Sequence, residues 1–322
     1  MILLHAYAQV SKSEFSSPEE EKILINAFHR EADLLFTMEH PGIPRFYKSF
    51  RHNGKSYIVM EYIKGTALEE IIKGSTTTFE EKRALHLGIQ VCEILCYLHN
   101  LSPEPVIYRD LKPSNIIITE ESIVRLIDFG VARRYYPSKD YDTVRLGTPG
   151  YAAPEQCRKK GQSIPQSDMY ALGVLMHQLL TLYEPSVTPF KLPAVRSLNA
   201  TASEQLEYII NKSINLDPRD RYIDTGLFRD EMVEYYEEHF GSFTSPYGKN
   251  LPDIKERSSS TLTSFSQLFS IIQQIIIYWI ITVVTLAFIF SWYIVNFELI
   301  IYFTFLLIFI PLCCLILPYI FK

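Results

Sequence analysis

The sequence predicts an α+β fold in which a small lobe that bears a sheet precedes a larger helical lobe, followed by a helical membrane-spanning hairpin. Three observations lead to this prediction. A β-hairpin pattern covers residues 45–62, helical patterns dominate between residues 166 and 239, and two long apolar runs follow residue 266. Strand patterns that come early and helical patterns that come later are typical of an α+β domain.

A helix and a hairpin are predicted in the first part of the chain. Apolar residues recur at helical intervals over residues 18–38, which indicates a helix. Residues 45–62 alternate between apolar and polar, and Asn53 with Gly54 supplies a tight hairpin turn. Residues 78–81 have the pattern of a capping box, which would open a helix that extends to Leu98.

The remainder of the domain is predicted to be mainly helical. Two short strands are expected at residues 116–119 and 124–128. Further helices are expected at residues 166–182, 203–214 and 226–239. The predicted organisation is a domain over residues 1–241, a juxtamembrane linker rich in Ser, Thr and Pro over 242–266, and two transmembrane helices within 267–322.

The two apolar runs are long enough to span a bilayer. No charged residue occurs in residues 258–297 or in residues 299–321. As helices, residues 275–295 and 299–321 would each cross a hydrocarbon core of about 30 Å. The alternative, a hairpin buried in a soluble core, fits less well because the runs are so long and so uniformly apolar.

The charges that flank these runs predict their orientation. Lys249, Lys255 and Arg257 precede the first run and Lys322 follows the second, whereas the connecting residues 296–298 carry no positive charge. The positive-inside rule then places the domain and both termini in the cytoplasm. The expected protein is a two-span, multi-pass membrane protein whose partner is the lipid bilayer, and its hairpin would also permit self-association.

Composition narrows the classes of partner. The net charge of −5 and the pI of about 5.9 do not favour a nucleic-acid partner. The five cysteines have neither the spacing of metal ligands nor that of a disulfide framework. A reducing cytoplasmic setting is therefore expected for the soluble part.

Residues 108–115 and 128–130 carry the chemistry. They place two carboxylates, a cation and an amide at fixed spacing along the chain. Asp110 can accept a hydroxyl proton, and Lys112 can bring positive charge near a phosphate. Asn115 and Asp128 offer the oxygen ligands that Mg²⁺ prefers. Together these groups predict phosphoryl transfer.

Residues 23–239 resemble a Hanks-type serine/threonine protein kinase, close in style to membrane-attached bacterial kinases. The matching stretches occur in the family's order at residues 29–35, 57–62, 106–115, 128–130, 147–155, 167–173 and 217–222. The resemblance implies a two-lobed, protein kinase-like domain that uses ATP and Mg²⁺. Its substrates would be proteins that carry Ser or Thr.

The resemblance assigns the chemical steps to four residues. Asp110 would accept or orient the proton of the substrate hydroxyl, and Lys112 would stabilise charge on the γ-phosphate. Asn115 and Asp128 would hold Mg²⁺ through oxygen. Lys112 also implies Ser/Thr rather than Tyr substrates.

Nucleotide contacts are implied for the small lobe and for the segment that follows it. Met60 would occupy the gatekeeper position, and Glu61 to Ile63 would present backbone groups to adenine. Glu31 would pair with a lysine on a neighbouring strand. Together with Asp128, these residues are the ones expected to bind ATP.

The resemblance also implies regulatory and structural roles for further residues. Arg109 would lie near the activation segment, where Thr143 would be phosphorylated, with Arg133 and Arg134 as further cations. The alternative for Thr143 is an unmodified loop residue. Thr148 would lie beside the catalytic acid. Structural roles are implied for Glu155, Asp168 and Arg221.

Two parts of the family pattern are missing, so the small lobe is expected to be truncated. No Gly-rich loop is present, because the first glycine is Gly42. The strand pattern before Glu31 falls on residues 4–10 and puts Ala8 at the lysine position, with Lys12 as a substitute beyond the strand. Losing both parts should weaken ATP binding and misplace the γ-phosphate.

Two interpretations stay open at this point. The first is a membrane-anchored serine/threonine kinase that transfers the ATP γ-phosphate to proteins in signalling. The second is a pseudokinase that acts as a membrane-attached scaffold or regulator with little or no phosphotransfer. The intact set of Asp110, Lys112, Asn115 and Asp128 favours the enzyme.

Overall fold

The computed structural model describes residues 2–5, 18–53, 55–136, 147–158 and 161–248. These residues belong to a compact unit that spans Met1–Pro252. The two predicted membrane spans lie outside the described residues. Within the described part, no helix combines the length and the apolar character that crossing a bilayer requires.

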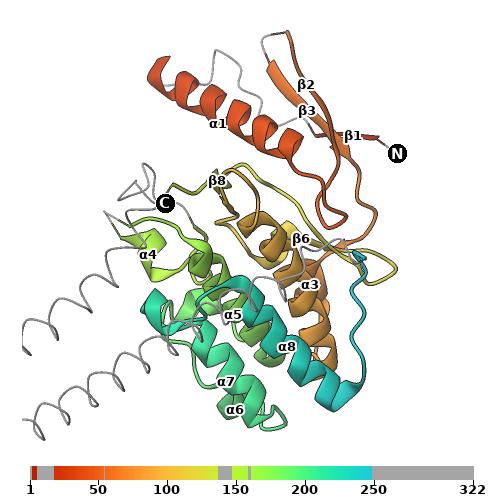
Figure 1. Cartoon of the computed structure of the whole chain (residues 1–322), viewed down its shortest axis with the longest axis vertical. Coiled ribbons are helices and arrows are strands. Elements are labelled where there is room, and N and C mark those ends of the chain that lie inside the picture. The colour runs from red at the N-terminus through yellow and green to blue at the C-terminus, as the bar shows by residue number, and fades with distance from the viewer. Residues whose placement is uncertain (1, 6–17, 54, 137–146, 159–160, 249–322) are drawn as a thin grey trace, which may run out of the picture. The chain divides into compact units, whose positions relative to one another are not determined.

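A three-stranded antiparallel sheet and one long helix form the small lobe (Figure 1). The strands β1 (Ile2–His5), β2 (Phe46–His52) and β3 (Lys55–Glu61) follow the order β1-β3-β2. Helix α1 (Pro18–Thr37) packs against β2 and β3. The helix predicted at residues 18–38 and the hairpin, which turns at Asn53 with a φ of 49°, are both confirmed.

The first described strand begins earlier in the chain than the sequence pattern predicts. Ile2–His5 pairs with residues 58–61 of β3, whereas the prediction placed the strand at residues 4–10. Antiparallel pairing with β3 decides the register here, because the backbone N–H and C=O groups of β1 need hydrogen-bond partners on that strand. Ala8 and Lys12, the two positions considered for the missing lysine, lie outside the described residues.

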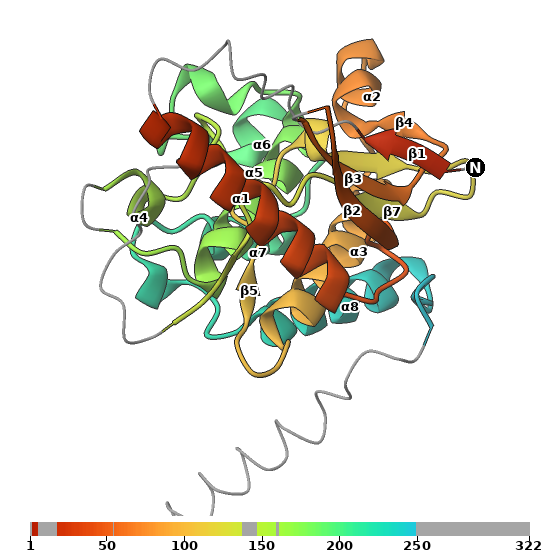
Figure 2. The same cartoon turned by 90° about the horizontal axis from the view of Figure 1, so that it is seen from above.

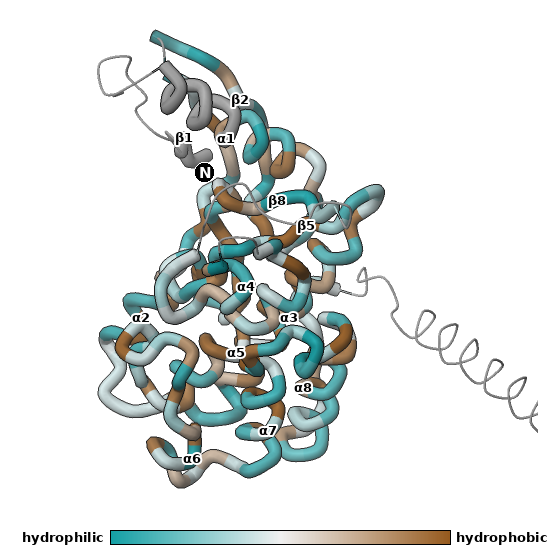
Figure 3. Tube along the Cα trace, turned by 90° about the vertical axis from the view of Figure 1, so that its left-hand side faces the viewer, coloured by the Kyte–Doolittle hydropathy of each residue, from teal (hydrophilic) through white to brown (hydrophobic). Residues whose placement is uncertain are grey.

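The helical lobe is built around α3 (Glu81–His99) and α5 (Pro165–Thr181), which are buried along most of their length. Hydrophobic stretches of α5 run through the interior of the lobe (Figure 3). Helix α8 (Thr225–Phe240) packs on α3, and α7 (Glu204–Ser213) packs on α5. The shorter helices are α2 (Leu68–Gly74), α4 (Pro154–Cys157) and α6 (Val195–Leu198). The helices predicted at residues 166–182, 203–214 and 226–239 are confirmed.

Short strands shape the surface of the helical lobe that faces α1. The order β4-β6-β7 joins β4 (Thr66–Ala67), β6 (Ile116–Ile118) and β7 (Val124–Leu126), and a second pair joins β5 (Val106–Ile107) to β8 (Arg133–Arg134). The two strands predicted at residues 116–119 and 124–128 are confirmed in shorter form. Seen from above, α1 lies across the top of this lobe (Figure 2). The motif residues sit on the loops between these strands.

The predicted capping box at residues 78–81 is wrong. Helix α3 begins at Glu81, its N-cap is Glu80, and no side chain caps it. The carboxylate of Glu81 is used elsewhere, because it accepts hydrogen bonds from the backbone N–H of Ser203 and from the hydroxyl of Tyr235 at 2.8 Å. A contact between helices thus takes the group that a local cap would need.

Beyond α8 the chain turns back along α3 toward the small lobe (Figure 1), and we call residues 242–248 the return segment. The hydroxyl of Ser245 donates to Glu93 at 2.7 Å. The buried hydroxyl of Tyr247 donates to the carbonyl of Val124 at 2.7 Å, and its ring lies 4.9 Å from that of His40. The first residues of the predicted linker therefore pack on the domain.

Replacing Tyr247 should loosen this end of the domain. Tyr247→Phe removes the buried hydroxyl that contacts the carbonyl of Val124 and, at 3.4 Å, the side-chain oxygen of Gln90, and should lower the free energy of unfolding by about 1 kcal/mol. Tyr247→Ala also leaves a cavity against His40 and should cost about 3 kcal/mol or more. Urea unfolding, followed by far-ultraviolet circular dichroism, measures the stability of both variants. The exposed Tyr208→Ala is the control, and equal stability of Tyr247→Ala and this control would contradict the packing argument.

Candidate active site

The backbone of the loop that follows β5 is held by one buried carboxylate. Asp168, near the start of α5, accepts the backbone N–H of Tyr108 and that of Arg109, each at 2.8 Å. Arg109 has a φ of 75°, in the left-handed region that an arginine rarely adopts. Such a conformation persists only where the surroundings fix it, and the two hydrogen bonds do so. The next residue, Asp110, is thereby placed.

Three polar side chains converge on the carboxylate of Asp110. The ammonium of Lys112 lies 2.7 Å from one oxygen, and the hydroxyl of Thr148 donates to the other at 2.7 Å. The amide nitrogen of Asn115 donates at 3.1 Å. Lys112 also reaches the hydroxyl of Thr148 at 3.0 Å, so the four groups form one network. Asp110 is ready to accept a proton from a hydroxyl placed beside it.

Asn115 and Asp128 present oxygen atoms near this network. The amide nitrogen of Asn115 donates to both the backbone and the carboxylate of Asp110, so its amide oxygen is the atom that it can offer a cation. Asp128 has a φ of 66°, and its carboxylate accepts the N–H of Gly130 at 3.1 Å. Hard oxygen donors of this kind suit Mg²⁺. The residues present therefore fit the metal that such chemistry uses.

Glu31 lies on α1 with its carboxylate turned to the segment that contains Asp128. Its side chain accepts a hydrogen bond from the backbone of Phe129, and Glu31 is only 2% exposed. Burial, with a smaller contribution from the charge of Asp128, raises its pKa to about 7. Among the described residues, its Oε1 atom has no hydrogen-bond partner. The lysine expected beside it is not found in that part of the chain.

Two buried rings connect the loop to this segment. Tyr108 and Phe129 meet edge to face with centroids 5.1 Å apart. The hydroxyl of Tyr108 donates to the carbonyl of Ile127, and burial raises the pKa of this phenol well above its usual value. Tyr108 therefore acts as a neutral packing residue that joins the two motif loops.

The residues expected to contact adenine lie at the end of β3. Met60 is buried opposite Phe46 of β2. Glu61 donates its N–H to the carbonyl of Arg45 at 2.8 Å, and its carboxylate pairs with Arg125 at 2.6 Å. The backbone N–H of Glu61 is thus already used, while Ile63 lies just beyond the strand and is half-buried.

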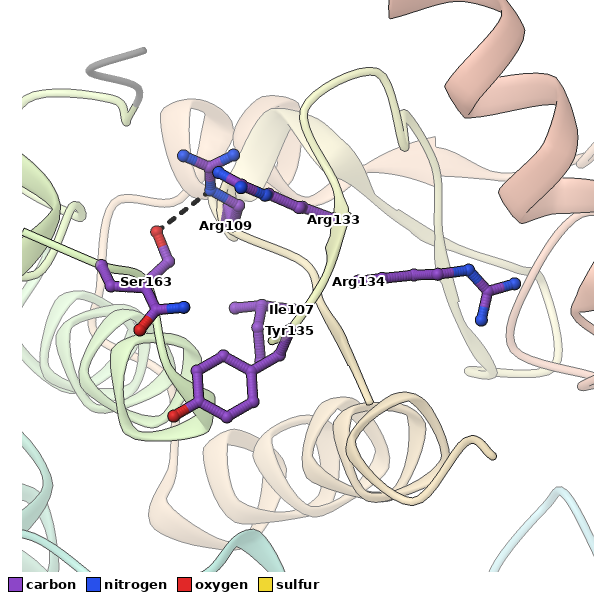
Figure 4. A pocket seen from close by; sticks show the side chains of 7 residues that line it. Ile107, Arg109, Arg133, Arg134, Tyr135 and Ser163 are labelled. Carbon is purple, nitrogen blue, oxygen red and sulfur yellow. Dashed lines mark hydrogen bonds between the residues drawn. The ribbon is translucent and has the colours of Figure 1, made fainter. Parts of the chain in front are cut away.

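Arginine side chains line a small pocket beside β8 (Figure 4). Arg109 donates from Nε to the hydroxyl of Ser163 at 3.0 Å, and both Arg109 and Arg133 face the pocket. Arg134 also lines the pocket, but its guanidinium extends away from it and donates to Glu104 at 3.4 Å. Thr143, the expected phosphorylation site, lies outside the described residues. The pocket combines two guanidinium groups with a hydroxyl, which is a suitable environment for an anion.

Glu155 and Arg221 form a bidentate ion pair under the loop. The two guanidinium nitrogens lie 2.8 and 3.0 Å from the two carboxylate oxygens. Ser167 also donates to Glu155 at 2.7 Å, and the guanidinium lies over the ring of Tyr170. A buried pair satisfied in this way resists separation, because removing one member leaves an uncompensated charge.

His99 is the functional neighbour that the sequence did not reveal. Its Nε2 atom lies 2.8 Å from Asp168 and its Nδ1 atom 2.6 Å from the hydroxyl of Thr225. The three residues come from α3, α5 and α8, so no local spacing could indicate the contact. Gln156 is a second such residue, since it donates to the backbone carbonyl of Arg109 at 3.1 Å.

Comparisons with known proteins agree with this geometry. The family model "Protein kinase domain" matches residues 5–230. The chain is 31% identical over 210 residues to the serine/threonine-protein kinase PrkC of Bacillus subtilis, covering 62% of this chain and 32% of that protein. It is 28% identical over 228 residues to the probable serine/threonine-protein kinase PknB of Lactococcus lactis, covering 67% and 35%.

A eukaryotic relative is also similar. The chain is 36% identical over 154 residues to the serine/threonine-protein kinase Nek1 of Mus musculus, which covers 48% of this chain and 12% of that protein. The matches thus span about a third of the two bacterial relatives and a smaller part of Nek1.

The shifted pKa of Glu31 should make stability depend on pH. The folded state holds this proton more tightly than the unfolded state, so the stabilisation is complete below pH 4.5 and is lost as the pH rises through about 7. Without divalent cations, Glu31→Gln should therefore be more stable than the wild type at pH 8, by up to about 3 kcal/mol.

Unfolding in urea at pH 5 and at pH 8, with a chelator present, measures this difference. Glu39→Gln, an exposed substitution at the end of the same helix region, should keep the wild-type pH profile. If Glu31→Gln shows that same profile, Glu31 does not titrate as its burial requires.

Proposed function

We propose that this chain, which belongs to the protein kinase domain family, is a serine/threonine protein kinase that transfers the γ-phosphate of ATP to protein hydroxyls. The observation that carries the proposal is the network at Asp110. A cation, an amide and a hydroxyl are held within hydrogen-bond reach of its carboxylate, which is the proposed base, and a second acid follows at Asp128. Phosphoryl transfer depends on positioning and on charge, and this network provides both.

Each member of the network has a role in the proposed reaction. Asp110 orients the substrate hydroxyl and takes its proton, while Lys112 stabilises the charge that develops on the γ-phosphate. Asn115 and Asp128 hold Mg²⁺, which would neutralise the phosphate oxygens when bound. Thr148, which donates to Asp110, keeps the carboxylate oriented toward the substrate.

Arg109 and Arg133 belong to the regulatory part of the proposal. Both face the pocket beside β8, where a phosphate on Thr143 would form charge-assisted hydrogen bonds. Because Arg109 directly precedes Asp110, such a phosphate would act on the loop that carries the base. Phosphorylation of Thr143 would then order this loop for catalysis.

A pseudokinase is the second candidate, and one observation favours it. Glu31 has no ion-pair partner among the described residues, although its counterpart in an active kinase is expected to pair with a lysine. Without a cation at that position the α- and β-phosphates are held less firmly, and transfer slows. The protein would then bind partners through its helical lobe rather than modify them.

Phosphotransfer distinguishes the two candidates. Incubated with radiolabelled Mg²⁺-ATP and a generic Ser/Thr protein substrate, the wild-type chain should incorporate label. Asp110→Asn keeps the shape of the side chain but removes the base, and should reduce the rate by about 10² to 10⁴. Equal background labelling by both forms would favour the pseudokinase.

We also propose that the chain is anchored in a membrane by its C-terminal residues, on the ground of the two uncharged apolar runs. After cell lysis and an alkaline wash, the full chain should stay in the membrane pellet. A form that ends at residue 257 should move to the supernatant. Recovery of both forms in the supernatant would rule out the anchor and leave the kinase proposal untouched.

A further inference from the structure

Glu31 is a buried acid that the proposed reaction leaves without a counter-charge. Its side chain is almost fully enclosed, and one carboxylate oxygen takes part in a hydrogen bond from the Phe129 backbone. The other oxygen, Oε1, has no partner in the part of the chain that the structure describes. A buried polar atom without a partner costs free energy, and more so when it carries charge.

A second acid adds to this cost. Asp128 lies close enough for its charge to act on Glu31, and the two carboxylates come from different lobes of the domain. Two cations of the helical lobe are committed to other acids, because Lys112 pairs with Asp110 and Arg125 pairs with Glu61. Within the described residues, then, the charge of one acid acts on the other, and no basic side chain pairs with Glu31.

We propose that Glu31 and Asp128 together bind a divalent cation, which takes the place that the ammonium group of a lysine partner would fill. The cation would satisfy Oε1 of Glu31 and cancel the repulsion between the two carboxylates. It would also bring positive charge to the side of the site that faces α1. The purpose of this cation rests on the proposed function, but its binding does not require phosphate transfer.

The composition of the site favours Mg²⁺ over other metals. In the described part of the chain, no three or more His, Cys, Asp or Glu side chains gather into a metal cage. Zn²⁺ and Ca²⁺ need such cages, whereas Mg²⁺ keeps several of its waters and binds through one or two carboxylates. Two carboxylates beside a nucleotide site match that requirement.

The cation would also connect the two lobes. Glu31 belongs to α1 in the small lobe, and Asp128 belongs to the loop after β7 in the helical lobe. A metal held by both would fix α1 in the position where nucleotide phosphates could share the same ion. Glu31 is thus proposed as a metal ligand of this particular chain.

Mn²⁺ binding to the full chain in the absence of nucleotide tests the proposal. The loss of the free-ion signal in electron paramagnetic resonance measures the dissociation constant, and added Mg²⁺ should displace Mn²⁺. Glu31→Gln and Asp128→Asn should each weaken binding by about tenfold or more. The double variant should bind little worse than either single one, because both acids hold one ion.

Glu93→Gln is the matched control. Glu93 is a similarly buried carboxylate, 4% exposed, but it contacts Ser245 in the return segment. It should leave Mn²⁺ affinity unchanged. Wild-type affinity in Glu31→Gln, together with a loss in Asp128→Asn, would overturn the proposal, because the ion would then be held without Glu31.

A further variant distinguishes a bound cation from a lysine as the partner of Glu31. If Lys12 supplied an ammonium to Glu31, Lys12→Ala would empty that position and strengthen Mn²⁺ binding several-fold, which would also overturn the proposal. The proposal expects unchanged affinity in Lys12→Ala. Mn²⁺ binding that depends on both Glu31 and Asp128, in a chain that transfers no phosphate, would refute the kinase function alone. Phosphotransfer in a chain whose Mn²⁺ affinity does not change in Glu31→Gln would refute this proposal alone.

Discussion

The two hydrogen bonds from Asp168 to the backbone of Tyr108 and Arg109 are the constraint on which the site depends. A carboxylate buried in the first turn of an apolar helix is costly unless every oxygen is satisfied. His99 completes the set, and Thr225 in turn fixes the imidazole, so the core of the helical lobe orients the acid. The left-handed Arg109 and the position of Asp110 follow from this anchor rather than from the loop itself.

The second half of the site depends on the attachment of α1. Directly after this helix, the N–H of Glu39 donates to the hydroxyl of Tyr97 in α3 at 2.7 Å. The ring of His40 lies between those of Tyr97 and Tyr247, 4.9 Å from each. Burial, with the charge of Arg125, lowers the pKa of His40 to about 4, so the ring stays neutral and packs as an apolar group. The helical lobe and the return segment thus jointly set where Glu31 lies.

What could be predicted from the sequence is what depends on neighbours in the chain. The network at Asp110 draws mostly on residues within one short loop, so the spacing of Lys112 and Asn115 indicated it. The pairing register of β1, the occupied carboxylate of Glu81 and the contacts of His99 depend on partners far along the chain. No local pattern reports such partners, because burial and cross-helix hydrogen bonds decide them only once the lobes are packed.

The energetic imbalance between the two halves bears directly on how the site would work. At Asp110 every charge already has its partner, whereas at Glu31 the fold carries a carboxylate whose raised pKa reflects an unfavourable environment. A ligand that supplies positive charge there would form the ion pair with Glu31 that the described residues do not provide. Its binding would stabilise the native state by mass action. Occupancy of the cation site at Glu31 and the packing of α1 on the helical lobe would therefore be coupled. In this chain the affinity for the cation, rather than an internal ion pair, would decide how much of the time the site is assembled.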